Sequence, residues 1–193
     1  DTFTRRNIGM TREESLASYR EVTAQAKQAG MWVRGYVSTA FYCPFEGKIS
    51  GDSVVAVTEE LLQMGVDEVS IGDTIGHAVP TEVTELTKKL LPVLPKTKFA
   101  YHFHDTRGSA LANVLAALEY GIEIFDSASG GAGGCPFAPG AAGNVATEDL
   151  VYMLHRMNIP TGINLSRLSD AALYLEAKLG RYLPGKYILA PEP

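Results

Sequence analysis

Two histidines separated by one residue, His102 and His104, are the side chains in this sequence best suited to hold a metal ion. They lie in residues 98–104, an apolar stretch that reads as a strand. Side chains alternate between the two faces of a strand, so both imidazoles point the same way and Phe103 points the opposite way. Asp105 follows directly and is a candidate to orient one ring. The spacing therefore predicts a metal site, against the alternative that it arises by chance among four histidines.

A glycine-rich segment ends in a cysteine that could do chemistry. Residues 130–134 hold four glycines, which have no side chains to pack, so this stretch is expected outside packed helix and strand. Cys135 follows and is itself followed by Pro136. The arrangement favours a mobile loop that brings a thiol to a site. The alternative is a small residue of the core.

Two further polar residues lie at predicted turns. Asn144 comes directly before a predicted helix, where its amide oxygen can reach a hard cation or the side chain can cap the helix. The predicted strand 68–71 is followed directly by the tripeptide Gly-Asp-Thr, which contains Asp73. The carboxylate of Asp73 therefore belongs either to a site at the strand end or to a cap on the following segment.

The elements that must position these residues repeat one pattern, an amphipathic helix, a glycine and a short apolar strand. Strands are expected at 32–37, 68–71, 98–104 and 122–126. Helices are expected after Thr11, which forms a capping box with Glu14, and at 53–64, 81–91, 109–120, 147–157 and 165–180. Alternating strands and helices predict a parallel sheet. Polar residues follow several different strands, which favours the rim site of a (β/α)8 TIM barrel over an open doubly wound sheet.

Only four strands are evident, whereas a complete barrel needs eight strands and about 250 residues. We therefore expect residues 1–193 to form a single partial TIM-barrel domain. It would hold roughly the C-terminal half, about four βα units plus C-terminal helices. A half-barrel that dimerisation completes is the alternative.

Composition excludes several classes of protein. The chain has 17 Lys and Arg against 22 Asp and Glu, a net charge of −5, and no basic block, so we expect neither a nucleic-acid nor a membrane-surface partner. No apolar run approaches the roughly 20 residues that span a bilayer. Two cysteines, Cys43 and Cys135, cannot form a secreted disulfide framework, which favours a reducing compartment. Whether these two cysteines pair with each other stays open.

Taken together, the motifs resemble the hydroxymethylglutaryl-CoA lyase family, which belongs to the metal-dependent lyases and Claisen synthases built on the TIM barrel. The resemblance runs through residues 3–8, 33–38, 43–50, 72–76 and 102–106. Its most specific part is 133–137 followed by 143–150. Related synthases share the His-x-His strand and the Gly-Asn pair but not the cysteine, so the cysteine favours a lyase.

The resemblance implies a role for each candidate residue. His102, His104 and Asn144 would bind a divalent metal cation, Mg²⁺ or Mn²⁺. His102 would also be the catalytic base, and Cys135 would transfer a proton to the acetyl-CoA carbanion. Asp73 matches an active-site aspartate at the barrel rim.

The implied reaction cleaves 3-hydroxy-3-methylglutaryl-CoA to acetoacetate and acetyl-CoA, as in leucine degradation and ketone-body metabolism. A cation would lower the pKa of the tertiary hydroxyl, and a positioned acid would quench the enolate. The implied partner is the small-molecule acyl-CoA substrate, and a homo-oligomer, a dimer, is expected. The expected compartment is the cytoplasm, or the mitochondrial matrix in a eukaryote.

The sequence departs from the family pattern in one respect. The family also needs an arginine and a metal-binding aspartate in an Arg-Asp-Gly motif, and a glutamate from a second strand; no Arg-Asp-Gly occurs here. We therefore expect this chain alone to be an incomplete, inactive fragment that binds metal weakly, and the full-length protein to be active. Two alternatives remain: a related lyase or aldolase acting on another acyl-CoA, and a non-catalytic barrel-half binding module.

Overall fold

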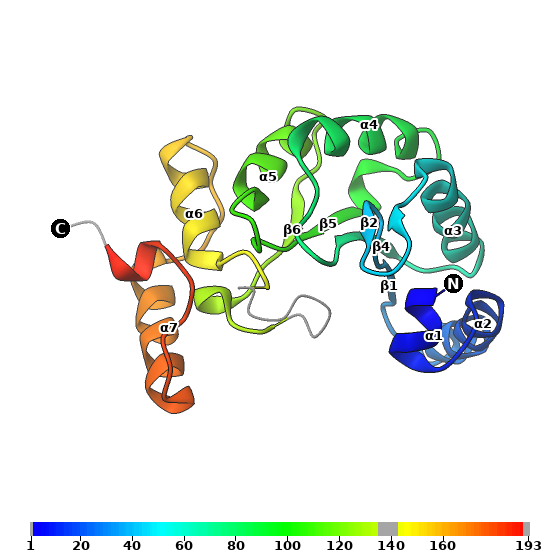
Figure 1. Cartoon of the computed structure of the whole chain (residues 1–193), viewed down its shortest axis with the longest axis horizontal. Coiled ribbons are helices and arrows are strands. Elements are labelled where there is room, and N and C mark those ends of the chain that lie inside the picture. Colours follow the sequence, from blue (N-terminus) through cyan, green and yellow to red (C-terminus); the bar gives the residue numbers. More distant parts are fainter. Residues whose placement is uncertain (1, 135–142, 191–193) are drawn as a thin grey trace.

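A curved four-stranded sheet runs through the middle of the chain (Figure 1). The computed structural model describes residues 2–134 and 143–190. The sheet order is β1 (Arg34–Val37), β4 (Glu68–Asp73), β5 (Phe99–Phe103) and β6 (Ile124–Asp126). All three pairs of neighbouring strands are parallel. The four predicted strands and their parallel arrangement are confirmed.

Helices alternate with these strands and lie along the outer side of the curved sheet (Figure 1). They are α3 (Gly51–Gln63), α4 (Pro80–Leu90), α5 (Ala110–Leu118) and α6 (Thr147–Arg156). Ahead of the sheet come α1 (Thr2–Ile8) and α2 (Arg12–Gln28). The predicted capping box of α2 is present, with the Glu14 amide donating to the Thr11 hydroxyl and the Thr11 amide donating to the Glu14 carboxylate.

The remaining elements are short, apart from α7. A two-stranded antiparallel hairpin pairs β2 (Tyr42–Cys43) with β3 (Gly47–Lys48). Single 3-10 turns lie at η1 (Lys96–Lys98), η2 (Ser129–Gly131) and η3 (Tyr187–Leu189), and the long helix α7 is Leu165–Leu179. No helix in the described part of the chain is long and apolar enough to cross a membrane.

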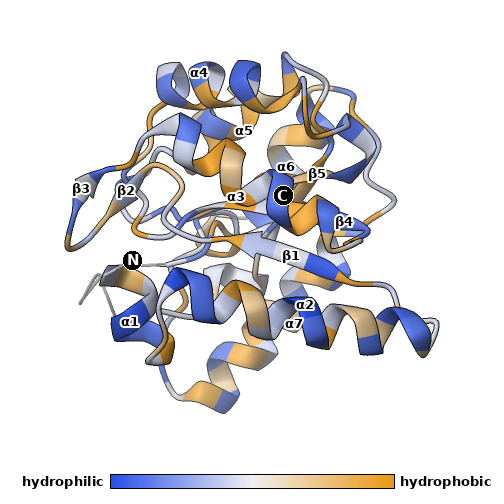
Figure 2. Ribbon diagram, turned by 90° about the vertical axis from the view of Figure 1, so that its right-hand side faces the viewer, coloured by the Kyte–Doolittle hydropathy of each residue, from blue (hydrophilic) through white to orange (hydrophobic). Residues whose placement is uncertain are grey.

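The main core lies between the outer face of the sheet and the helices. Phe99, Tyr101 and Phe103 alternate along β5 on this face, with neighbouring ring centroids 4.8 Å apart. Tyr101 is fully buried, and its hydroxyl lies 2.8 Å from that of Thr87 on α4. Figure 2 shows α5 mostly in the orange of apolar residues and α2 with several blue turns. A satellite cluster of Ala172, Leu183 and Ile188 joins α7 to the chain that follows it.

The register of the sheet decides which side chains share a face. Gly72 pairs with His102, and His102 pairs with Asp126. Residues paired directly across neighbouring strands point to the same side, because successive side chains alternate. His102 and Asp126 therefore lie on the inner face, away from the helices. Asp73 pairs with Phe103 and lies on the outer, helix-covered face.

Candidate active site

The predicted histidine pair converges at the C-terminal end of β5. The Nε2 atoms of His102 and His104 lie 3.1 Å apart, and their ring centroids lie 5.0 Å apart. The prediction that both imidazoles turn to the same side is confirmed. His104 is 9 % exposed, whereas His102 is partly exposed and lines an open pocket.

A third donor comes from a distant part of the chain. Asn144 forms an antiparallel backbone bridge with His104, and its side chain lines the same pocket as His102. The Asn144 amide nitrogen donates to the Ala132 carbonyl at 2.9 Å, which leaves the amide oxygen as an acceptor. The structure thus brings His102, His104 and Asn144 together, as the sequence predicts.

These donors fit one hard divalent cation. Two adjacent ligands on an octahedral ion with bonds of roughly 2.1 Å lie about 3 Å apart, close to the separation of the two Nε2 atoms. Imidazole nitrogen and amide oxygen are ligands that such ions accept. Within residues 2–134 and 143–190, no group of three or more His, Cys, Asp and Glu side chains could hold a metal, so a third donor to the histidine pair would have to be of another type, such as the Asn144 amide.

His104 is held in the form that binds metals. Burial, and then the nearby His102, lower the pKa of His104 to about 4. The imidazole is therefore neutral near pH 7, and a neutral imidazole has a lone pair to offer a cation.

Two sequence interpretations of neighbouring residues are wrong. Asn144 does not cap α6, because the N-cap of that helix is Ala146 and no side chain bonds there. Asp105 does not orient a histidine ring, because its Oδ1 accepts the Ala110 amide at the start of α5, at 3.0 Å.

Asp126, at the end of β6, is the carboxylate that faces a histidine. Its Oδ2 lies 3.4 Å from Nδ1 of His102 and accepts the Ser70 hydroxyl at 3.0 Å. Its Oδ1 lies 2.5 Å from Nη1 of Arg34. Burial raises the pKa of Asp126, but the bonds from His102, Arg34 and Ser70 outweigh burial and lower it, so the carboxylate is ionised. In the sequence Asp126 is the last residue of the predicted strand 122–126, and nothing local indicates its role, because only the sheet register shows its neighbours.

Arg34 crosses the inner face of the sheet from β1. Its Nη2 pairs with Glu68, and its Nη1 donates to Asp126 and, at 3.0 Å, to the Tyr36 hydroxyl. Burial opposes the charge, but the bonds to Tyr36 and Asp126 raise the pKa of the guanidinium above its usual range. The side chains of Arg34, Glu68 and Asp126 are 20 %, 10 % and 17 % exposed, so these charges depend on one another for compensation.

Asp73 is not brought to the histidine pair. It is 1 % exposed on the outer face of β4, and its two oxygens accept the amides of His77 and Ala78 at 3.0 Å each. These hydrogen bonds cap the segment that follows β4, which is the second of the two roles that the sequence allows for Asp73. Burial raises the pKa of Asp73.

Cys135 lies outside the described residues, and the chain on either side of 135–142 adjoins the site. A Cβ atom added at Gly133 would lie 2.7 Å from Nδ2 of Asn144. Earlier in the glycine-rich segment, the fully buried Glu148 accepts the Gly130 amide at 2.6 Å and the Ser129 hydroxyl at 3.0 Å. The first glycines lie in the single 3-10 turn η2, in which Gly130 has a non-helical φ of +60°, so this part of the segment lies outside packed helix and strand, as the sequence predicts.

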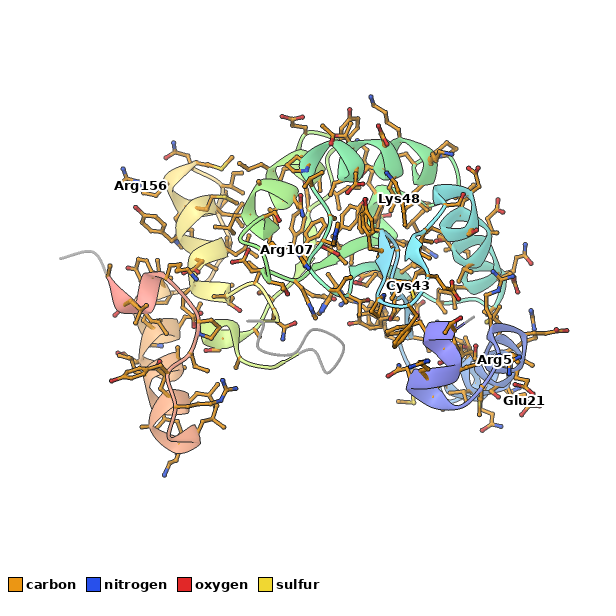
Figure 3. All side chains as sticks on the ribbon, viewed as in Figure 1. Arg5, Glu21, Cys43, Lys48, Arg107 and Arg156 are labelled. Atoms are coloured by element: carbon orange, nitrogen blue, oxygen red, sulfur yellow. The ribbon has the colours of Figure 1, made fainter. Side chains whose placement is uncertain are left out.

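Two openings surround these groups. The first is the open pocket lined by Tyr36, His102, Phe125, Asp126, Ser127 and Asn144. The second is a cavity of about 420 Å³ between α1, α2, α3 and the end of β1, and Tyr36 lines both. Figure 3 labels Cys43 and Lys48 on the hairpin beside this cavity, and Arg107, whose guanidinium donates to the carbonyls of Ile75 and Gly76. Sequence reasoning did not predict the cavity, because it forms between elements far apart in the chain.

Parallel strands covered by helices on one side, with histidine and carboxylate side chains at the carboxyl ends, define part of a TIM barrel with a candidate rim site. Residues 1–174 match the family described as HMGL-like, and the chain belongs to this family. It is 45 % identical over 186 residues to the hydroxymethylglutaryl-CoA lyase YngG of Bacillus subtilis, covering 96 % of this chain and 62 % of that protein. It is 44 % identical over 186 residues to the mitochondrial hydroxymethylglutaryl-CoA lyase of Homo sapiens, and the match covers 96 % of this chain and 57 % of that protein.

Solved structures agree with these relationships. The crystal structure of the Bacillus subtilis HMG-CoA lyase matches with a TM-score of 0.95, covering 97 % of this chain and 63 % of that one. An HMG-CoA lyase from Acinetobacter baumannii, in complex with coenzyme A and 3-methylmalate, matches with a TM-score of 0.93 at 42 % identity, covering 99 % and 62 %. The chain thus spans about three fifths of the length of these relatives. The predicted fold class, a partial TIM barrel, is confirmed.

Proposed function

We propose that the protein cleaves 3-hydroxy-3-methylglutaryl-CoA to acetoacetate and acetyl-CoA with the help of a divalent cation. The observation that carries the proposal is that His102 and Asn144 line one pocket, with Nε2 of His104 3.1 Å from Nε2 of His102, in a chain 45 % identical to a lyase of that name. Coenzyme A and 3-methylmalate bound to the Acinetobacter baumannii lyase support an acyl-CoA as the class of substrate.

His102, His104 and Asn144 would hold the cation, Mg²⁺ or Mn²⁺, through two imidazole nitrogens and one amide oxygen. When bound, the cation would lower the pKa of the substrate's tertiary hydroxyl. The chain's own contribution is to hold these donors in place before binding, since β5 positions both histidines and the Ala132 carbonyl fixes the amide of Asn144. A site arranged in advance loses little entropy on binding.

His102 carries two proposed roles, ligand and base, that compete for one lone pair. Its Nδ1 faces Asp126, so only Nε2 is directed to the pocket and to His104. The geometry favours the ligand role. The base role of His102 stays a prediction that metal binding and turnover can separate.

Cys135 would deliver the proton that converts the acetyl-CoA carbanion to acetyl-CoA. The proposal for this residue rests on its sequence motif and on the position of Gly133, two residues earlier, where an added Cβ would lie 2.7 Å from Nδ2 of Asn144. For Asp73 the catalytic role also stays a proposal. The two hydrogen bonds that Asp73 accepts from backbone amides support a positioning role, because they hold the turn that follows β4 at the rim.

We also propose that the protein works as a dimer, in the cytoplasm or, in a eukaryote, in the mitochondrial matrix. The open side of β1, which pairs only with β4 in the described sheet, is a surface that a second copy or further strands would cover. Sedimentation of the full-length protein should give the mass of two chains, and a monomer at micromolar concentration would contradict the dimer.

The proposed activity is tested by acetoacetate release from 3-hydroxy-3-methylglutaryl-CoA, with Mg²⁺ and after treatment with a chelator. We expect turnover by the full-length protein that the chelator abolishes and Mg²⁺ restores, and none by the 193-residue chain alone. Turnover of another acyl-CoA in preference would assign a related lyase or aldolase. Binding of coenzyme A without turnover of any acyl-CoA would assign a non-catalytic module.

A further inference from the structure

Asp126 lies between a fixed cationic side chain and an imidazole. On one side Nη1 of Arg34 pairs with Oδ1 of Asp126 at 2.5 Å. On the other side Oδ2 faces Nδ1 of His102 at 3.4 Å and accepts the Ser70 hydroxyl. None of the charged or metal-binding roles proposed above uses this carboxylate.

We infer that Asp126 is a positioning residue that fixes the tautomer of His102, so that Nδ1 carries the hydrogen and Nε2 offers its lone pair to the cation site. The functional value of this tautomer rests on the proposed cation site. The tautomer itself is a property of the metal-free chain and can be measured without the cation.

The carboxylate cannot turn away from His102, because its other partners come from neighbouring strands on the same inner face. Arg34 lies on β1, Ser70 on β4, His102 on β5 and Asp126 on β6, so all four strands of the sheet contribute. Arg34 is itself held by Glu68, which pairs with it in the register of β1 and β4. A guanidinium only donates, so an oxygen of residue 126 must stay on that side.

An ionised carboxylate has no hydrogen to donate, so the imidazole nitrogen that faces it must be the donor. The 3.4 Å separation is longer than a tight hydrogen bond, and Oδ2 is the carboxylate oxygen turned to Nδ1 because Oδ1 pairs with Arg34. Two further rings lie against His102: His104, on the Nε2 side, and Tyr36, edge-on with centroids 6.5 Å apart, whose hydroxyl accepts from Arg34. Carboxylates that accept from a metal-binding histidine in this way fix its orientation and raise its basicity.

The first experiment measures the tautomer without metal, by long-range ¹H–¹⁵N NMR of ¹⁵N-histidine-labelled protein. Wild type should show His102 with a protonated Nδ1. In Asp126→Asn, Arg34 keeps the amide oxygen on its side, so the amide NH₂ faces Nδ1 and the hydrogen should move to Nε2. The matched control is Asp105→Asn, whose carboxylate caps α5 and should leave the His102 tautomer unchanged.

The wild-type spectrum is decisive even if Asp126→Asn fails to fold. A protonated Nε2 as the main form of His102 in folded wild type would overturn the inference. An unchanged tautomer in folded Asp126→Asn would also overturn it.

The second experiment measures Mn²⁺ affinity by calorimetry and EPR on the full-length protein. Asp126→Asn should weaken binding by about 10- to 100-fold, as loss of such a partner does in other metal sites. Ser70→Ala, which keeps the carboxylate and Arg34, should weaken it less. Equal affinities for wild type and Asp126→Asn would overturn the inference. Full Mn²⁺ affinity and the expected tautomer in a protein without lyase activity would reject the proposed function and support the role of Asp126.

Discussion

The Nε2 atoms of His102 and His104 lie 3.1 Å apart at the end of β5, close enough for one ion to contact both. This contact follows from the strand itself, since residues two apart project to the same side. Asn144 joins them from beyond the glycine-rich segment, 40 residues along the chain from His104. The site therefore combines a local pair with one distant residue, and the two parts can be tested separately.

Replacement of either histidine should weaken cation binding. His102→Asn and His104→Asn each remove a proposed ligand, and we expect Mn²⁺ affinity to fall at least about 10-fold in calorimetry, as even loss of an outer partner does. The control is His155→Asn, an exposed residue bonded to Thr161, which should bind Mn²⁺ as wild type does. If His102→Asn keeps full Mn²⁺ affinity but loses turnover, His102 is the base and not a ligand.

Cys135→Ala should lower kcat and leave Mn²⁺ affinity unchanged. The thiol is proposed to donate a proton to carbon, and loss of a positioned acid costs about 10²- to 10⁴-fold in rate. Steady-state kinetics of the full-length protein and Mn²⁺ titration make the comparison. A wild-type kcat in the variant would remove the cysteine from the mechanism.

Arg34→Ala should destabilise the fold strongly. It leaves the mostly buried carboxylates of Glu68 and Asp126 without the cation that both of them contact. Removal of one partner of a buried charge pair costs about 3–5 kcal/mol, and partial exposure here reduces the expected loss to about 2–4 kcal/mol of unfolding free energy. Urea denaturation of wild type and Arg34→Ala measures this loss of unfolding free energy.

The matched control for Arg34 is Lys27→Ala, which breaks the more exposed pair with Asp67. Exposed pairs contribute up to about 1 kcal/mol. Similar losses in the two variants would show that the network across the sheet is no stronger than a surface pair.

Gly76 lies in the turn after β4, and a side chain there should disturb the histidine strand. Its φ is +59°, and an added Cβ would lie 2.7 Å from Cβ of Thr106 and 2.9 Å from the carbonyl oxygen of His104. Gly76→Ala should therefore lower both the thermal midpoint and Mn²⁺ affinity.

The control for Gly76 is Gly65→Ala, where φ is +88° but nothing lies within 4 Å of the added atom. Gly65→Ala should lower the free energy of unfolding by about 1–2 kcal/mol, because alanine is strained in the left-handed conformation. It should leave Mn²⁺ affinity unchanged. Equal effects of the two substitutions on Mn²⁺ affinity would contradict the contact with His104.

Stability should depend on pH through Glu82, which links α4 to the hairpin. Partial burial raises the pKa of Glu82, but the bonds from Lys48 and Tyr42, 3.0 Å each, outweigh burial and hold the pKa below its usual range. A lowered carboxyl pKa stabilises the fold above the unfolded-state value of about 4.3, and this contribution is lost as pH falls through the folded-state pKa.

Glu82→Gln should thus be less stable than wild type near pH 7, by up to about 1 kcal/mol, and the difference should close by pH 3. Thermal unfolding between pH 3 and 7 measures this difference. The control is Glu85→Gln, an exposed glutamate on the same helix. A difference that persists unchanged at pH 3 would show that ionisation of Glu82 is not its source.

Much of the fold follows from local patterns in the chain. Helix starts such as Thr11 with Glu14, and short strands such as 68–71, depend on neighbours within a few residues, so the sequence predicts them well. The His102–His104 pair belongs to the same class, because period-two alternation is a property of any strand. Asn144 was identified through its motif, and its capping alternative was removed only by the position of Ala146.

The partners of these residues were decided by the tertiary structure. Asp73 and Asp126 both end strands and look equivalent in the sequence, but the register places Asp73 opposite Phe103 and Asp126 opposite His102. One carboxylate is therefore buried among backbone amides and the other faces the histidine. A one-residue shift in register would exchange the faces, and the register is fixed only when the strands pack against their neighbours and the helices. Residue types and their local spacing thus determined which groups can act, and packing of distant strands decided which of them meet.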